Sequence, residues 1–330
     1  MHMSDALLSP ATAVTMYALS GAAAGVSVKK LSQDEKAMEK LPVMGVMSAM
    51  VFAGQMINYT IPGTGSSGHL CGGMLLSGIL GPYAGFLSMI AVLMIQAFFF
   101  ADGGLLALGA NVWNMAFYGC FLGYFLIYRP ILNSKLFGDD LKKAMPKKLT
   151  LASILGCVIT LQFGAFSVSI ETLASGITEL PFGTFVSLMQ PIHLAIGLVE
   201  GLITAAVLVF IYENRPEMLA MTKDGKESWT KKKMYTVLGI ITALVGGILS
   251  LFASKHPDGL EWTIAKVTDA ELESSTKLQK ITSFLPDYSF SNGAAIGTSV
   301  SGIVGALILV AIALIVYGVA MTVRKKKSNA

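Results

Sequence analysis

The chain has 330 residues, of which 13% are charged and 54% hydrophobic, and its formal net charge is +4. A soluble domain carries charge on roughly a quarter of its residues, whereas a surface in contact with lipid requires none. The composition therefore excludes an ordinary soluble protein and predicts an integral membrane protein. We expect the lipid bilayer, and no nucleic acid, among its partners.

The apolar residues gather in segments of helical length, which predicts an all-α membrane fold with about nine transmembrane helices. In chain order the segments cover about residues 10–28, 41–61, 70–81, 83–101, 109–128, 150–173, 187–212, 235–254 and 294–322. The third segment is shorter than the roughly 20 residues that a full crossing needs. We therefore expect it to be tightly packed, tilted or only partly inserted.

The basic residues indicate the orientation, because loops on the cytoplasmic side retain Lys and Arg. Of the 24 basic residues, 20 follow an odd-numbered segment: Lys29, Lys30, Lys36, Lys40, Arg129, Lys135, Lys142, Lys143, Lys147, Lys148, Arg215, Lys223, Lys226, Lys231, Lys232, Lys233, Arg324, Lys325, Lys326 and Lys327. The other four lie between the last two segments: Lys255, Lys266, Lys277 and Lys280. This pattern predicts an N-terminus outside and a C-terminus in the cytoplasm.

The N-terminus is expected to be retained and exposed outside the membrane. The first basic residue is Lys29, so residues 1–28 lack the positive region with which a secretory signal peptide begins. Met1 is expected to survive processing because His2 is a large second residue. The sequence also lacks the GxxxxGK[ST] pattern of a P-loop ATPase, so any ATP hydrolysis must come from other subunits.

Two of the four histidines, His2 and His69, are predicted to lie on the outer side. A free amine at Met1, the amide nitrogen of His2 and the Nδ1 atom of its imidazole form a chelate of fused rings. One imidazole from His69 would complete four nitrogen donors, a set that suits Ni²⁺ or Cu²⁺. The alternative is that His2 is an ordinary terminal residue and His69 a polar loop residue. Because the nitrogens must lose their protons to bind, metal affinity should fall as the pH drops.

Other polar residues could support such a site or serve the structure alone. His193 and Glu200 lie seven residues apart, on one face of the seventh segment, and an intramembrane pair of this kind suggests either a cation or proton relay or a structural contact. We favour a structural or gating role for them. Asp102, Asn111 and Asn114 either orient the histidines through hydrogen bonds or cap helices.

The first segment carries small residues at four-residue spacing. They form two pairs: Ala18 with Ala22 and Gly21 with Gly25. Small residues on one helix face allow close helix contact in lipid, either within the chain or with another subunit. The outer loop at 255–293 is polar, and we expect it to be solvated.

Several of these motifs together resemble the CbiM/NikM family, the substrate-binding components of energy-coupling factor transporters for cobalt and nickel. They are Met1-His2-Met3, the loop from Gly65 to His69, the stretch from Gly104 to Asn111, and the stretch from Pro191 to Gly197 with Glu200. The resemblance covers about residues 1–215. Residues 235–330, with Pro257 to Glu261, resemble the two-helix accessory subunit of the same systems.

The resemblance implies three parts. Residues 1–215 are a metal-binding component of seven helices, 216–234 are a cytoplasmic linker, and 235–330 are a two-helix part with the loop 255–293. It implies that Met1, His2 and His69 hold a transported Co²⁺ or Ni²⁺ ion, with no permanent cofactor. The face formed by Ala18, Gly21, Ala22 and Gly25 would contact a transmembrane coupling subunit, and two ATPase subunits would drive transport.

Three alternatives are kept beside this interpretation. A secondary metal-ion transporter would use His193 and Glu200 as a cation or proton relay. A membrane metalloenzyme would need a catalytic carboxylate, for which Asp102 is the candidate, although we expect no enzymatic activity. A scaffold subunit would have incidental histidines. The planar nitrogen set leans toward nickel over cobalt without deciding between them.

Overall fold

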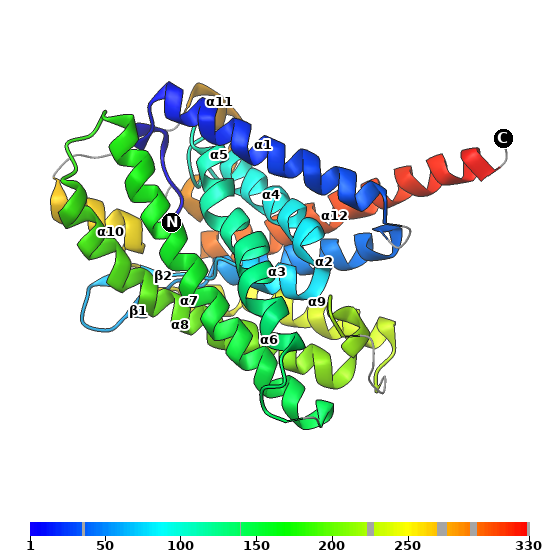
Figure 1. Ribbon diagram of the computed structural model, residues 1–330. Coiled ribbons are helices and arrows are strands. Elements are labelled where there is room, and N and C mark those ends of the chain that lie inside the picture. Colours follow the sequence, from blue (N-terminus) through cyan, green and yellow to red (C-terminus); the bar gives the residue numbers. More distant parts are fainter. Residues whose placement is uncertain (35–36, 139, 223–227, 269–275, 291–295, 329–330) are drawn as a thin grey trace.

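The computed structural model describes residues 1–34, 37–138, 140–222, 228–268, 276–290 and 296–328. It is a bundle of long helices with one small hairpin of two strands (Figure 1). The principal helices are α1 (Pro10–Ser32), α2 (Ala37–Gln55), α3 (Gly73–Leu80), α4 (Pro82–Phe99), α5 (Leu108–Asn111), η2 (Val112–Tyr128), α6 (Arg129–Asn133), α7 (Leu141–Ser175), α8 (Phe182–Asn214), α9 (Lys231–Gly247) and α12 (Ile296–Ser328). The shorter elements are η1 (Asp5–Leu7), β1 (Tyr59–Ile61), β2 (Ser66–Gly68), η3 (Pro216–Met218), η4 (Leu249–Phe252), α10 (Gly259–Val267), α11 (Lys277–Thr282) and η5 (Pro286–Tyr288).

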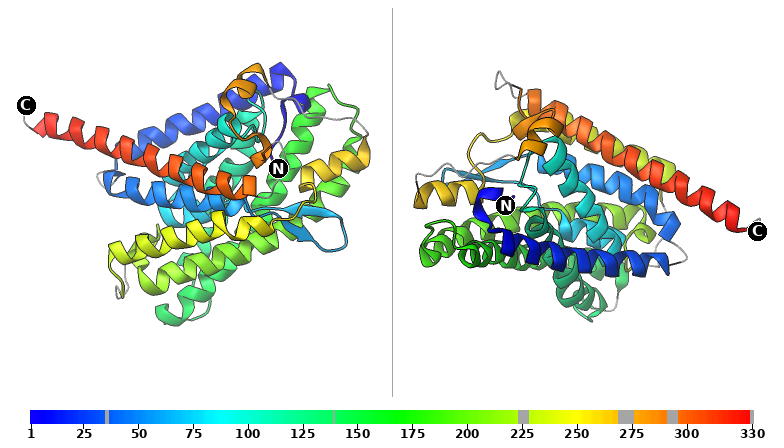
Figure 2. Two further views of the ribbon diagram at one scale, coloured as in Figure 1. Left: turned by 180° about the vertical axis from the view of Figure 1, so that it is seen from behind. Right: turned by 90° about the horizontal axis from the view of Figure 1, so that it is seen from above.

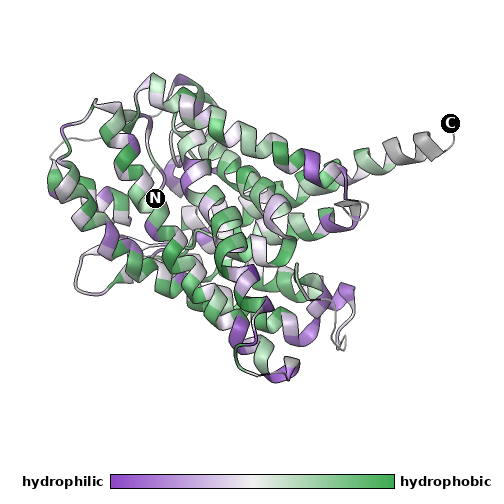
Figure 3. Ribbon diagram, viewed as in Figure 1, coloured by the Kyte–Doolittle hydropathy of each residue, from purple (hydrophilic) through white to green (hydrophobic). Residues whose placement is uncertain are grey.

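Within the described residues, seven helical stretches are long and apolar enough to cross a membrane. They are 10–32, 82–99, 108–133, 142–175, 182–214, 231–252 and 296–322. Hydrophobic residues dominate the bodies of the helices and hydrophilic residues gather toward their ends (Figure 3). This confirms a multi-pass, all-α membrane protein. The remaining two predicted segments correspond to α2, which has 19 residues, and α3, which has eight.

The third predicted segment does not cross the bundle as one helix. The eight residues of α3 extend only about 12 Å, less than half of a hydrocarbon core of about 30 Å. All eight are buried, so the short helix is enclosed by protein rather than by lipid. The amide of Ala220 donates to the carbonyl of Gly78 (3.1 Å), which places the end of α3 beside the segment that follows α8. The β1–β2 hairpin and α3 together take the place of a full helix.

The predicted end of the second segment is wrong by several residues. That segment was expected to run to about residue 61, but α2 ends at Gln55 and residues 59–61 form β1, antiparallel to β2. The physical reason lies in the turn between the strands, where Gly63 and Gly65 adopt positive φ angles of 78° and 79°. Glycine reaches this conformation without steric cost.

The C-terminal helices join the bundle at α2 and do not form a separate unit. Both α9 and α12 pack against α2, and α12 also contacts α4. The view from above in Figure 2 places α1 and α12 on opposite sides of the bundle, with α2 and α4 between them. The described part of the loop between α9 and α12 is ordered, with α10 packed on α8 and α11 on α4. Many of its residues, among them Lys255 and His256, are nevertheless exposed, so the expectation of a solvated loop still applies to them.

Some sequence predictions fall on parts of the chain that are not described. Lys36, Lys223 and Lys226 lie outside the described residues, as do residues 223–227 of the predicted linker. Residues 269–275 and 291–293 of the predicted outer loop lie outside them as well. The side chains of residues 324–327 are not described either.

Candidate metal site

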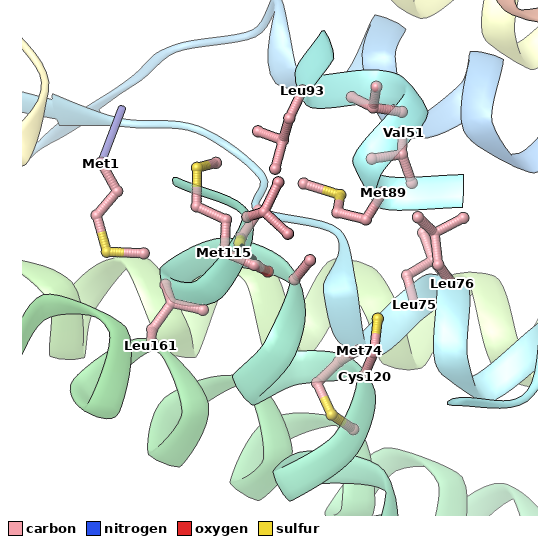
Figure 4. Packing of buried hydrophobic residues seen from close by; sticks show 14 of the residues in the cluster. Met1, Val51, Met74, Leu75, Leu76, Met89, Leu93, Met115, Cys120 and Leu161 are labelled. Carbon is pink, nitrogen blue, oxygen red and sulfur yellow. Dashed lines mark hydrogen bonds between the residues drawn. The ribbon is translucent and has the colours of Figure 1, made fainter. Parts of the chain in front are cut away.

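The first eight residues form an arm that runs into the bundle. Met1 is 6% exposed and Met3 is fully buried. Figure 4 shows the Met1 side chain extending toward α7, next to Leu161 and Met115. Leu7 and Leu8, each 1% exposed, bury the other end of the arm just before α1 begins. Apolar burial at both ends therefore holds His2, which lies between them, inside the protein.

Main-chain hydrogen bonds fix the path of this arm. The side chain of Asn111 accepts from the Met3 amide (2.7 Å) and donates to the Met3 carbonyl (3.1 Å). That carbonyl also accepts from the amide of Gly104 (2.9 Å). A Cβ atom at Gly104 would lie 1.8 Å from the Asp5 carboxylate, so only glycine allows the two segments to pass this closely. Asn111, a candidate for orienting the histidines, thus positions the backbone next to His2.

The Met1 amine forms an ion pair with Asp258, at 2.5 Å from Oδ2. The two side chains are 5% and 15% exposed. Burial alone would lower the pKa of the amine, but the nearby Asp258 carboxylate outweighs it and raises that pKa above its ordinary value. Burial would likewise raise the pKa of Asp258, yet the amine and His69 hold it well below its usual range. A metal ion can bind the amine only after the amine has lost its proton.

The His2 ring is oriented by a chain of amide side chains. His2 Nε2 lies 3.1 Å from Gln96 Oε1, and Gln96 Nε2 donates to Gln55 Oε1 (2.9 Å). Gln55 Nε2 in turn donates to the carbonyl of Cys71 (2.9 Å). Because this carbonyl can only accept, it sets the direction of both amides and requires His2 Nε2 to carry a hydrogen. The Nδ1 atom of His2 is then the one available to a metal.

Asp102 lies on the Nδ1 side of the same ring. Its Oδ1 atom is 3.2 Å from His2 Nδ1, and its Oδ2 atom accepts from the hydroxyl of Tyr288 at 2.5 Å. Burial lowers the pKa of His2, so the ring favours the neutral form that a metal requires. Asp102 therefore lies next to the predicted ligand atom of His2; in the neutral tautomer both facing atoms are acceptors, so the contact becomes favourable only when a proton or a cation lies between them.

The loop histidine lies against the terminal one. The rings of His2 and His69 are stacked with centroids 5.4 Å apart and an angle of 23° between their planes. His69 Nδ1 lies 3.0 Å from the carbonyl of Leu70, which can only accept, so the Nδ1 atom carries the hydrogen and Nε2 has the lone pair. Burial lowers the pKa of His69 to about 4, which leaves the imidazole neutral at physiological pH.

Side chains alone do not assemble a metal site here. Among the described residues, no group of three His, Cys, Asp or Glu side chains is placed to hold a metal ion. A site at this position must therefore recruit main-chain nitrogen, and the amine of Met1 and amide of His2 are the nitrogens next to the two stacked rings. These atoms can supply an all-nitrogen donor set, which suits Ni²⁺ and Cu²⁺.

The remaining predicted residues have partners of their own. Glu200, 1% exposed, accepts from the amides of Cys71 (2.8 Å) and Gly72 (2.9 Å), directly before α3 begins. His193 Nδ1 lies 2.8 Å from the carbonyl of Met189. The two side chains thus contact different groups, and Glu200 anchors the segment that follows His69. Asn114 donates to Glu171 Oε2 (2.7 Å) and does not reach the histidines.

The start of the loop between α9 and α12 covers the site. The amide of Ser67 donates to the carbonyl of Pro257 (2.8 Å), and the Ser67 hydroxyl donates to the carbonyl of His256 (2.8 Å). Asp258 caps α10, where its side chain accepts from the amides of Leu260 and Glu261. The cap fixes the carboxylate beside the Met1 amine.

The second half of the loop packs against the end of α4 and the segment that follows it. Gln279 on α11 donates to the carbonyls of Ala97 (3.1 Å) and Gly103 (2.9 Å). The Tyr288 ring stacks on Phe100, with centroids 5.1 Å apart. The loop thereby holds the segment between α4 and α5 that carries Asp102.

Comparison with known proteins decides the family. Residues 2–218 match the family model "Cobalt uptake substrate-specific transmembrane region", and residues 232–322 match the "PDGLE domain". The chain belongs to this cobalt uptake family. It is a metal-transport protein and not an enzyme.

Relatives with both parts are known. The chain is 34% identical over 321 residues to a putative fused nickel transport protein NikMN of Archaeoglobus fulgidus, covering 94% of this chain and 96% of that protein. It is 31% identical to a probable fused nickel transport protein LarMN of Lactiplantibacillus plantarum, covering 87% of this chain and 84% of that protein. A crystal structure described as a truncated transition metal transporter superposes with a TM-score of 0.54 at 33% identity, covering 64% of this chain and 99% of that one.

Sequence reasoning missed three contributors to this site. Gln55 and Gln96 lie in apolar segments without a recognisable motif, and only their mutual contact shows their role. Asp258 lies within the Pro257 to Glu261 motif, but its contact with Met1 spans 257 residues of sequence. The signals available were a polar residue within each apolar helix and the Pro257 to Glu261 motif.

Proposed function

We propose that this chain captures Co²⁺ or Ni²⁺ at the outer face of the membrane as the substrate-specific subunit of an ATP-driven importer of the energy-coupling factor type. The observation that carries the proposal is the buried N-terminal arm, which stacks His2 on His69 at 5.4 Å and buries the Met1 amine next to them. Similarity to nickel and cobalt transport proteins supports Ni²⁺ or Co²⁺ as the ion.

The proposed ligands are four nitrogen atoms from Met1, His2 and His69. They are the amine of Met1, the amide and Nδ1 of His2, and Nε2 of His69. The hydrogen bond from His2 Nε2 to Gln96 and that from His69 Nδ1 to Leu70 leave the required ring atoms available to the ion. Hydrogen bonding of the other ring nitrogen is the usual support of a metal-binding histidine.

The proposed coupling subunit docks on α1. The residues Ala18, Gly21, Ala22 and Gly25 are all exposed, and a Cβ atom at either glycine would have no neighbour within 4 Å. A surface of small residues permits a partner helix to approach closely in lipid. Two ATPase subunits would act through this partner, because the sequence contains no P-loop of its own.

In this proposal residues 1–215 form the metal-binding component, 216–234 the cytoplasmic linker, and 235–330 the accessory part. The ion pair of Asp258 with the Met1 amine and the hydrogen bonds of Ser67 support a closing role for the 255–293 loop. Once the ion is bound, the loop would exclude water from the nitrogen set.

The decisive experiment for the site is calorimetric titration of Ni²⁺ and Co²⁺ into the purified chain and its His69→Ala variant. Removing the imidazole deletes one of four ligands, so high-affinity binding of both ions should be lost. The matched control is His256→Ala, which removes an exposed imidazole. The backbone carbonyl of His256, which accepts from the Ser67 hydroxyl, is retained. Unchanged affinity in His69→Ala would overturn the proposed ligand set.

Uptake measurements separate the importer from a secondary transporter. Metal uptake by the importer should stop when the nucleotide-binding residues of the ATPase subunits are replaced. It should continue when the membrane gradient is dissipated. The reverse result would favour a relay through His193 and Glu200. The separate partners of these two side chains support the importer.

A further inference from the structure

His193 presents a nitrogen lone pair that the four-nitrogen site does not use. The side chain is 1% exposed, and its Nδ1 atom is 2.8 Å from the carbonyl of Met189, one turn earlier on α8. A carbonyl only accepts hydrogen bonds, so Nδ1 carries the hydrogen and Nε2 has the lone pair. A histidine that donates from one ring nitrogen to a backbone carbonyl is oriented in the way that metal-binding histidines are.

The Nε2 atom has no hydrogen-bond partner among the described residues, although it is fully buried. Nearly all buried side-chain nitrogens in folded proteins have a partner, and an exception calls for an explanation. A packing role for the ring would be served as well by an apolar side chain, without the cost of removing Nε2 from water. The unpartnered nitrogen therefore indicates a ligand that binds there.

The surroundings of Nε2 identify that ligand. His193 lines a small cavity together with Met1, His69 and Asp258, so its ring borders the proposed metal position. Gly259, the first residue of α10, lies beside the ring and lines the same cavity. A Cβ atom at Gly259 would be 3.0 Å from Cε1 and 3.5 Å from Nε2, so the lack of a side chain at Gly259 leaves room next to the buried nitrogen.

We propose that His193 Nε2 is a fifth ligand of the transported ion, outside the plane of the four nitrogens, and that it enables the site to hold Co²⁺ as well as Ni²⁺. The proposal rests on the function proposed above and refines its metal specificity. Four planar nitrogens satisfy low-spin Ni²⁺, which has little affinity for a further ligand. High-spin Co²⁺ gains more from an additional imidazole, so this residue determines how well the two ions compete.

The test is the His193→Asn variant of the full chain. The asparagine amide retains a donor for the Met189 carbonyl but has no atom in the place of Nε2. Calorimetric titration should show Co²⁺ affinity falling about tenfold or more relative to Ni²⁺ affinity, as expected for loss of one supporting ligand. The visible absorption of bound Co²⁺ should change as the ion loses its fifth ligand, whereas that of bound Ni²⁺ should stay the same. The exposed His256→Asn substitution is the matched control and should change neither quantity.

An unchanged ratio of Co²⁺ to Ni²⁺ affinity, with an unchanged spectrum of bound Co²⁺, would overturn the fifth ligand. This result is distinct from failure of the proposed function, which would appear as retained binding in His69→Ala. A second measurement needs no substitution and decides the matter if the variant does not fold. In Co²⁺-loaded wild-type protein, three histidine N–H protons should show paramagnetic NMR shifts, from His2, His69 and His193, and two shifted signals would refute the proposal.

Discussion

Replacing Glu200 with glutamine should weaken metal binding although Glu200 is not a proposed ligand. Its carboxylate accepts from the amides of Cys71 (2.8 Å) and Gly72 (2.9 Å), two and three residues after His69. A glutamine oxygen can accept from one of these amides, but its NH₂ group would face the other donor. The Glu200→Gln variant therefore leaves one buried N–H without a partner and weakens the hydrogen bond that is kept.

The expected cost follows from these two hydrogen bonds. An unsatisfied buried N–H costs about 1–3 kcal/mol, and a bond to a neutral acceptor is weaker by about 1 kcal/mol than one to a carboxylate. Removing a buried charge offsets part of this cost, leaving about 2 kcal/mol. If this loss falls on the conformation that holds His69 in place, metal affinity decreases about 30-fold.

Calorimetric titration of Ni²⁺ and thermal unfolding in detergent measure this effect. The matched control is Glu213→Gln, an exposed glutamate on the same helix, which should change both quantities little. If Glu200→Gln binds Ni²⁺ with wild-type affinity and unfolds at the wild-type temperature, Glu200 does not anchor the His69 segment. The reasoning from its hydrogen bonds would then be refuted.

Two further predictions concern protonation and the support of His2. In Gln96→Leu the Nε2 hydrogen of His2 loses its acceptor. The Ni²⁺ affinity measured by titration should therefore fall about 10- to 100-fold. A variant with wild-type affinity would contradict the tautomer assigned to His2. Metal affinity should also fall as the pH drops. The pKa of His69 is lowered to about 4 and that of the Met1 amine is raised, so between about pH 6 and 8 the competing protons come from the amine and the His2 amide. Release of two protons predicts a change of about a hundredfold per pH unit, and titrations across this range that show no pH dependence would contradict main-chain ligation.

Much of the fold was predictable because lipid imposes a simple requirement on the sequence. A helix that crosses the membrane must be apolar over its whole length, so α4, α7, α8 and α12 appear directly as apolar segments. The requirement weakens where protein replaces lipid. The buried α3 is short because its neighbours enclose it, and the hairpin before it is polar backbone shielded by the bundle. Hydropathy alone could not distinguish the hairpin and α3 from one more membrane-spanning helix.

The candidate site was predictable to the extent that its chemistry is local. The adjacency of Met1 and His2 is written in the sequence, and charge patterning was enough to predict His69 on the same side. The support of the site depends on contacts between distant segments, such as Gln96 with Gln55 and Asp258 with Met1. Helical spacing correctly put His193 and Glu200 on one face, but it could not show that each has a different partner.

The most direct measurement of the central claim is the Ni²⁺ affinity of the chain with two residues, Gly-Ser, added before Met1. The addition converts the amine into an amide and fills the space beside Asp258, while every side chain is retained. High-affinity binding should be lost, whereas the same dipeptide added after residue 330 should leave the affinity unchanged. Equal Ni²⁺ affinity in the two extended proteins would contradict a metal site built on the Met1 amine.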